Sequence, residues 1–167
     1  MIDPSLTYYD AQKEEEITNH KVLKMVVAAM KEYKDQRKHD PPNGLAIIAE
    51  LSFGFWTSLF NKKYFELLNR DPLRAFSKGR PPGIIWSVIN DKLMKVRTFR
   101  NRVYHYEPLC FQKNTRNILC FDHLEEIHND IRDLLTWLNP ELTQWLGDVD
   151  LVTEKLKKLR KKYLDEK

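Results

Sequence analysis

The sequence contains few cysteines and no long uninterrupted apolar run, and each of these two shortages excludes a class of protein. The two cysteines, Cys110 and Cys120, lie ten positions apart without a CxxC spacing, which fits neither a zinc knuckle nor a disulfide-stapled scaffold. We therefore expect reduced, structural thiols. The most apolar stretch, 45–60, is interrupted by polar residues, and the N-terminus lacks the basic-then-apolar pattern of an export signal. These absences predict a soluble, cytoplasmic protein without a membrane partner.

The remaining composition predicts one helical domain. The 167 residues are 42% hydrophobic and 11% aromatic, which is enough for a proper core, and we expect a single domain over residues 1–167. Five glycines and eight prolines cluster at a few places and leave long stretches with apolar residues at helical spacing, so the fold class is predicted as all-α. The net charge of +4 favours a polyanionic partner only slightly.

The expected helices follow from the apolar periodicity and the breaks between them. They are Asp10–Lys38, Leu45–Phe60, one or two short helices within Tyr64–Phe76, Ile84–Tyr106, Phe121–Leu138, a short helix from Asn139 to Leu146, and a charged helix from Asp148. Helix 45–60 is apolar on every side, which predicts the central helix of a bundle. In helix 84–106 a core-facing stripe is expected from Ile85, Ile89, Leu93, Val96 and Val103.

The last turn of the predicted helix 84–106 carries a cationic arginine and a titratable histidine, the side chains best suited to catalysis in this sequence. Glu107 precedes a proline, which disfavours the α conformation and ends the helix, so Arg100 and His105 share its last turn. On an ideal helix these two residues lie about 140° apart. Asn101 and His105, four positions apart, share a face beside Arg97, and we expect this polar face to point away from the core.

These residue types suit cleavage of a phosphodiester in RNA without a metal. Such a reaction needs a base for the 2′-hydroxyl proton, an acid for the leaving oxygen and positive charge at the phosphorus centre. An imidazole and a guanidinium supply these properties, and Tyr104 and Tyr106 could stack on unpaired bases. A purely structural interpretation remains open, in which Arg100 pairs with Glu50 or Glu107 and His105 caps the helix C-terminus.

Three ordered segments resemble the Abi-like family of abortive phage infection, within the HEPN superfamily of helical domains. The segments read AELSFGFWTSLF from Ala49 to Phe60, RNRVYHYEP from Arg100 to Pro108, and HNDIRDLLTWLNPEL from His128 to Leu142. The resemblance is strongest over residues 44–146. It implies an HEPN-like helical bundle with additional short helices, often dimeric, in which an RxxxxH motif forms a metal-independent endoribonuclease site at the interface between protomers.

Carried onto this sequence, the motif arginine is Arg100, the polar residue after it is Asn101, and the motif histidine is His105. These three are the predicted catalytic residues. Four neighbouring residues are candidates for RNA contact: Arg97, Arg102, Tyr104 and Tyr106. His128 also falls on a characteristic position, but we expect a structural histidine there. The resemblance implies no cofactor or metal. The implied partners are single-stranded or loop RNA, a second copy of the chain, and an antitoxin protein.

Three functions are therefore weighed. The first is an endoribonuclease acting in phage defence or as a toxin. The second is a non-catalytic RNA- or protein-binding HEPN module, including a truncated Abi-like protein, because the sequence has little room for the further N-terminal helical region that such proteins usually carry. The third is a structural or assembly role through dimerisation of the motif helix, without nucleic acid.

Overall fold

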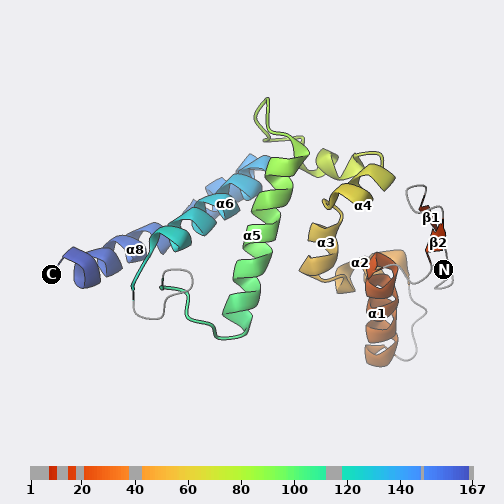
Figure 1. Ribbon diagram of the computed structural model, residues 1–167, viewed down its shortest axis with the longest axis horizontal. Coiled ribbons are helices and arrows are strands. Elements are labelled where there is room, and N and C mark those ends of the chain that lie inside the picture. The colour runs from red at the N-terminus through yellow and green to blue at the C-terminus, as the bar shows by residue number, and fades with distance from the viewer. Residues whose placement is uncertain are drawn as a thin grey trace. The chain divides into compact units, whose positions relative to one another are not determined.

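The computed structural model describes residues 8–10, 15–17, 21–37, 43–111, 118–147 and 149–165. Of the chain break expected at residues 40–44, positions 40–42 lie outside the described residues, as does Asp148, the first residue of the last predicted helix. The chain folds as two compact units, residues 1–59 and 60–167, which are described separately below (Figure 1). Compact units are not by themselves domains, so the single domain stays a prediction. Apart from one short hairpin the described chain is mostly helical, which confirms the all-α class at this coarse level.

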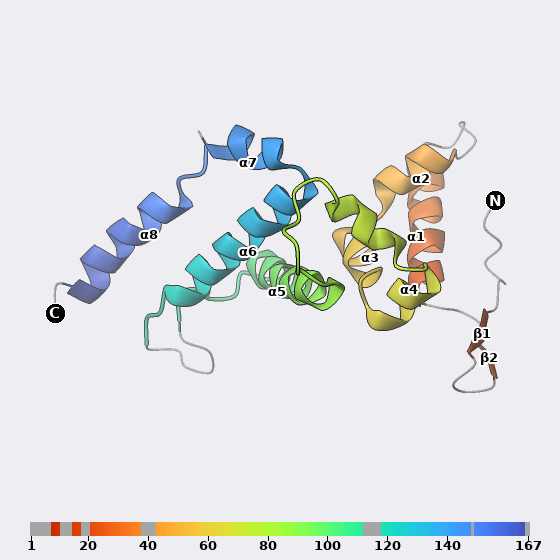
Figure 2. The ribbon, with the colours of Figure 1, turned by 90° about the horizontal axis from the view of Figure 1, so that it is seen from above.

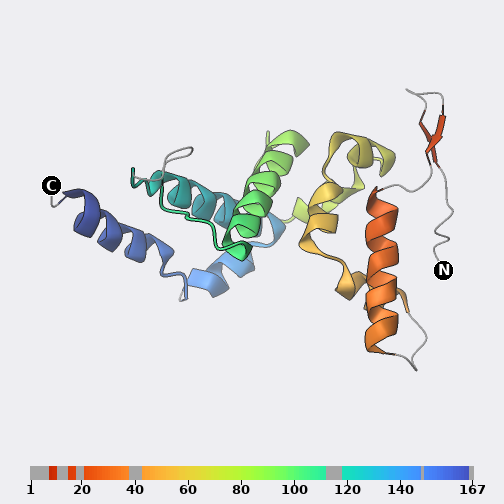
Figure 3. The same cartoon turned by 60° about the horizontal axis from the view of Figure 1, so that its bottom comes forward.

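The described residues of the first unit form one pair of short strands and three helices. Strands β1 (Tyr8–Asp10) and β2 (Glu15–Ile17) pair antiparallel. Helix α1 (Lys21–Gln36) follows, and it contacts α2 (Gly44–Glu50) and α3 (Phe53–Ser58). Figure 3 shows α2 beside α1. Among the described side chains of α1, those of Val26, Ala29 and Tyr33 are buried at helical spacing and belong to its core face.

Two predictions for this unit are wrong. The predicted helix Asp10–Lys38 begins only at Lys21, because the residues before it carry charge without a continuous apolar face, and helices in proteins depend on packing such a face. The predicted central helix Leu45–Phe60 is two short helices. Ser52 has extended backbone and its Oγ accepts the Phe55 N–H at 3.3 Å. It is therefore the N-cap of α3 and interrupts the predicted helix. Helix α2 has no buried residue.

The second unit begins with a cluster of aromatic rings around two short helices. Helix α4 (Lys62–Leu67) and the 3₁₀ helix η1 (Asp71–Phe76) confirm the two short helices expected around Pro72. The Phe65 ring lies 5.2 Å from that of Trp86 and 6.3 Å from that of Phe60, and Phe60 in turn contacts Phe76. Phe60, Phe65 and Phe76 are buried, so this cluster fixes the start of the next helix.

The basic loop after η1 packs against the C-terminal end of a later helix. Gly79 donates its N–H to the carbonyl of Trp137 at 3.2 Å, which satisfies one of the last carbonyls of that helix. A Cβ on Gly79 would lie 2.0 Å from the carbonyl oxygen of Thr136, so only glycine fits there. Gly83 adopts a φ of +87°, which glycine tolerates without strain.

Helices α5 (Trp86–Tyr104) and α6 (Asp122–Leu138) form the centre of the second unit, followed by α7 (Pro140–Gly147), α8 (Val152–Arg160) and a π-helical turn, η2 (Lys161–Asp165). Figure 2 shows α6 lying against α5 and α7 beside the end of α6. The predicted helices at these positions are confirmed to within a few residues. Ile89 of α5 and Ile127 and Leu134 of α6 are buried.

The predicted core stripe of α5 is correct only in its middle. Ile89 is fully buried and Leu93 and Val96 are half-buried, whereas Ile85 and Val103 are exposed. Ile85 precedes the helix with extended backbone, and Val103 lies in the last turn. The C-terminal turn of α5 thus presents apolar as well as polar side chains at the surface.

Candidate functional site

The last turn of α5 closes with a C-terminal cap that places a tyrosine in a backbone conformation usually taken by glycine. His105 is the C-cap residue and donates its N–H to the carbonyl of Asn101 at 3.0 Å. Tyr106 donates to Val103, and Glu107 donates to Arg102 at 2.9 Å, the pair of reversed bonds that defines a Schellman motif. Tyr106 has a φ of 55° in this motif and its side chain is 95% exposed.

Arg102 holds the chain that follows this cap. Its Nε donates to the Glu107 carboxylate at 3.1 Å and its Nη2 donates to the Pro108 carbonyl at 2.6 Å. Both bonds bring residues beyond the helix back onto its last turn. The guanidinium charge is therefore used within the protein, which favours a positioning role for Arg102 over direct contact with RNA.

Arg100 and His105 meet the same aromatic ring, although an ideal helix would separate them. The Arg100 guanidinium carbon lies 5.7 Å from the centre of the Tyr104 ring, a cation–π contact. The His105 ring lies edge-on to Tyr104, with the ring centres 5.4 Å apart. Tyr104 lies four positions after Arg100, the spacing at which helix side chains meet, and directly before His105, so its ring contacts both side chains. Arg100, Tyr104 and His105, which we term the motif cluster, are all exposed.

The other predicted residues lie around this cluster with different surroundings. Asn101 is exposed and joined to His105 through the main-chain bond described above. Arg97 is half-buried one turn earlier on α5. Arg100 does not form the ion pair with Glu107 that the structural interpretation considered, because Glu107 binds Arg102 instead. Within the described ranges Arg100 forms no ion pair, so its guanidinium is held by the Tyr104 ring and faces solvent.

Ion pairs between α5 and α6, which the apolar periodicity of the sequence did not reveal, hold α5 in place. Lys92 binds the buried carboxylate of Asp130 and lies 2.9 Å from Asp133. Burial lowers the pKa of Lys92, but the hydrogen bonds to these two carboxylates outweigh burial, so the pKa lies above 10.5. One turn later Lys95 binds Glu126 and lowers the pKa of that carboxyl.

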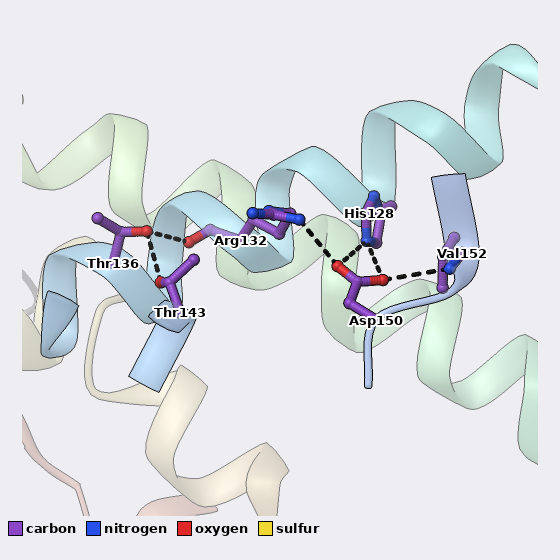
Figure 4. A network of polar contacts seen from close by, with 6 residues as sticks. All are labelled: His128, Arg132, Thr136, Thr143, Asp150 and Val152. Atoms are coloured by element: carbon purple, nitrogen blue, oxygen red, sulfur yellow. Dashed lines mark hydrogen bonds and ion pairs between the residues drawn. The ribbon is translucent and has the colours of Figure 1, made fainter. Parts of the chain in front are cut away.

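His128 belongs to a separate network that fastens α8 to α6, shown in Figure 4. Its Nε2 lies 2.9 and 2.8 Å from the two carboxylate oxygens of Asp150, and Arg132 donates to the same carboxylate at 3.0 Å. Asp150 also accepts the N–H of Val152 at the start of α8. Burial raises the pKa of Asp150, but these donors outweigh it and the pKa lies below 3.8. The contacts fit the structural role expected of His128.

Comparisons with protein-family models, with curated proteins and with solved structures found no match to this chain. The resemblance to the Abi-like family and the HEPN-like arrangement of helices stay predictions. Among the described helices none is long and apolar enough to cross a membrane. The described residues contain no group of three or more His, Cys, Asp or Glu placed to hold a metal ion.

Proposed function

We propose that the protein is a metal-independent endoribonuclease of the HEPN type that acts on single-stranded or loop RNA in the cytoplasm, in phage defence or as a toxin. The observation that carries the proposal is the motif cluster: an exposed guanidinium and an exposed imidazole held against one exposed aromatic ring. The resemblance of the flanking segments supplies the biological setting. No cofactor is needed for this chemistry.

Each member of the cluster has a distinct task in this reaction. His105 removes the 2′-hydroxyl proton while the resulting oxygen attacks phosphorus, and an imidazolium returns a proton to the departing 5′-oxygen. Arg100 stabilises the negative charge that builds up on the phosphoryl oxygens. Asn101 orients the phosphate or the imidazole. The exposed rings of Tyr104 and Tyr106 offer stacking surfaces for unpaired bases.

The backbone of Tyr106 adds independent support. A bulky residue with positive φ is held against its backbone preference, and such positions concentrate at functional sites. The side chain packs against almost nothing in this chain, since it is 95% exposed. A tyrosine at a position that favours glycine is explained if its ring contacts a ligand.

A homodimer completes the proposed site. Val103, Tyr104 and Tyr106 expose apolar surface beside two polar catalytic groups. Packing of two copies through the ends of α5 would bury part of this surface and supply a second imidazole, so that one histidine acts as base and the other as acid.

The deciding experiment is an RNA-cleavage assay with matched controls, run with chelator present. His105→Ala should lose at least about a hundredfold in cleavage rate, and Arg100→Ala a similar factor. The controls are His123→Ala and Arg74→Ala, which remove an exposed histidine and an exposed arginine from α6 and η1. Equal loss in the controls, or full activity in His105→Ala, contradicts the proposal.

The exposure of the whole cluster favours one second function, an RNA-binding module without turnover. Exposed cationic and aromatic side chains suffice to bind single strands through phosphate contacts and stacking. This function predicts tight binding that weakens as salt rises, with the RNA recovered intact. An antitoxin protein remains a candidate partner under either function, and it would cover the motif cluster.

A further inference from the structure

The two cysteines lie opposite each other at the base of the connection between α5 and α6. Phe111 and Leu119 form an isolated antiparallel bridge, and the next pair outward is Cys110 and Cys120. The Cys120 N–H donates to the Cys110 carbonyl at 2.8 Å, one half of the exchange that marks directly opposed residues. Residues ten positions apart in the sequence are thus neighbours across a short ladder.

This placement puts the two Cα atoms within the range of separations that a disulfide spans. Directly opposed residues in a hydrogen-bonded antiparallel pair have Cα atoms about 5.5 Å apart. Disulfides join residues whose Cα atoms lie about 4.4–6.8 Å apart. Because side chains of opposed residues leave the ladder on the same side, the two thiols face the same space.

Both thiols are free and reachable in the folded chain. Cys110 and Cys120 are unpaired with each other and each is partly exposed. The Cys120 sulfur makes one weak contact, 4.0 Å from the Asp122 carboxylate. Buried structural cysteines are inert, whereas accessible ones exchange with external disulfides.

We propose that Cys110 and Cys120 form a reversible intramolecular disulfide, with glutathione disulfide as the oxidant. One cysteine thiolate attacks glutathione disulfide and releases one glutathione thiolate, leaving a mixed disulfide on the protein. The second cysteine thiolate then attacks the protein sulfur of that mixed disulfide and releases the second glutathione. Two protein thiols are oxidised, one glutathione disulfide is reduced to two glutathiones, and the two thiol protons pass to the solvent or the released thiolates.

Cys110 and Cys120 lie close in the chain to the motif cluster, but the proposed disulfide does not depend on the proposed RNA function. Cys110 follows Pro108 by two positions, and the Pro108 carbonyl is held by Arg102 at the end of α5. Cys120 precedes Asp122, the first residue of α6. The disulfide therefore links the chain that follows α5 covalently to the start of α6.

The test uses the full chain in glutathione buffers of graded composition, followed by alkylation of free thiols and tryptic digestion without reduction. Lys113 and Arg116 lie between the cysteines, so the disulfide joins two separate tryptic peptides, 103–113 and 117–132. The joined pair should appear, lose two hydrogen atoms relative to its free parts, and disappear after treatment with dithiothreitol. Alkylation of both cysteines at every buffer composition overturns the proposal.

Two controls test whether the disulfide forms because the folded chain holds the two cysteines together or only because they are close in the sequence. The equilibrium constant for forming the disulfide should be at least about tenfold higher in the folded chain than in concentrated urea, because the ladder holds the thiols together. An equal or lower constant in the folded chain contradicts the proposal. In an equal mixture of normal and ¹⁵N-labelled chains, joined peptides of mixed isotope content would show cross-links between chains and would also contradict it.

Cys110→Ser and Cys120→Ser complete the design. Each variant should stop at the mixed disulfide with glutathione, because no second thiol remains to displace it. If the parent also stops at this stage and carries glutathione on both cysteines, the two sulfur atoms do not meet and the proposal fails.

Discussion

Replacing Tyr106 with glycine should make the protein more stable, although most substitutions destabilise. The left-handed conformation costs a residue with a Cβ about 1–2 kcal/mol, and Tyr106 adopts it with a φ of 55°. Glycine removes this cost but loses about 0.5–1 kcal/mol through its greater freedom in the unfolded chain. Loss of burial adds almost nothing, because the tyrosine side chain is 95% exposed.

The expected net gain in the free energy of unfolding is about 0.5–1 kcal/mol, which corresponds to a rise in Tm of roughly 1–4 °C for a chain of this size. Thermal unfolding followed by circular dichroism, supported by urea unfolding, measures it. Tyr106→Ala is the matched control, since it also removes the ring but keeps the Cβ and thus the backbone cost. A glycine variant less stable than the alanine variant would refute the assignment of the strained cap.

The same variant should bind RNA more weakly if the proposed function is correct. Stacking of one base on an aromatic ring contributes about 1–3 kcal/mol, so removal of the Tyr106 ring should weaken binding roughly fivefold to a hundredfold. Titration of fluorescent single-stranded RNA gives the Kd. Unchanged affinity in a more stable variant would leave the cap assignment intact and remove Tyr106 from the RNA-contacting residues.

Three further variants test the contacts that hold the second unit together. Gly79→Ala should lower the free energy of unfolding by about 1–3 kcal/mol in a urea titration, because its methyl group meets a carbonyl oxygen of α6, whereas Gly44→Ala has open space and should not. Lys92→Met should cost about 3 kcal/mol by leaving the Asp130 carboxylate buried without its main partner, and adding Asp130→Leu should restore most of the loss. Asp150→Asn should cost about 1–2 kcal/mol at pH 7. Because the folded-state pKa of Asp150 is lowered, its contribution is present above the unfolded pKa near 3.8 and lost as pH falls through the folded value, so parent and variant should converge in acid, measured by urea unfolding from pH 7 to pH 2.

The sequence predicted the helices of the second unit well because their apolar residues repeat at helical spacing over long stretches. The prediction failed at 45–60, because a segment that is apolar on every side has no distinct buried face to locate helix ends. There the N-cap at Ser52 divides the segment into two helices. The prediction also failed before Lys21, where charged residues were assigned to a helix without an apolar stripe to pack.

The sequence supplied the candidate site residues, which stay predictions, but not the geometry in which they lie. Helical spacing separated Arg100 from His105, whereas both side chains contact the ring of Tyr104, which lies four positions after Arg100 and next to His105. The positive φ of Tyr106 was invisible, since glycine and not tyrosine signals that conformation. Asp130 and Lys92 were missed because periodicity counts only apolar residues and cannot find a charged pair within a packed seam.

The proposed function requires Arg100 and His105 to act together on RNA. Single-turnover cleavage of one fixed RNA is compared for the parent, Arg100→Ala, His105→Ala and the double variant. The double variant should lose about as much activity as either single variant, because both groups serve one transition state. A parent that leaves the RNA intact, or losses that simply multiply between the single variants, would contradict it.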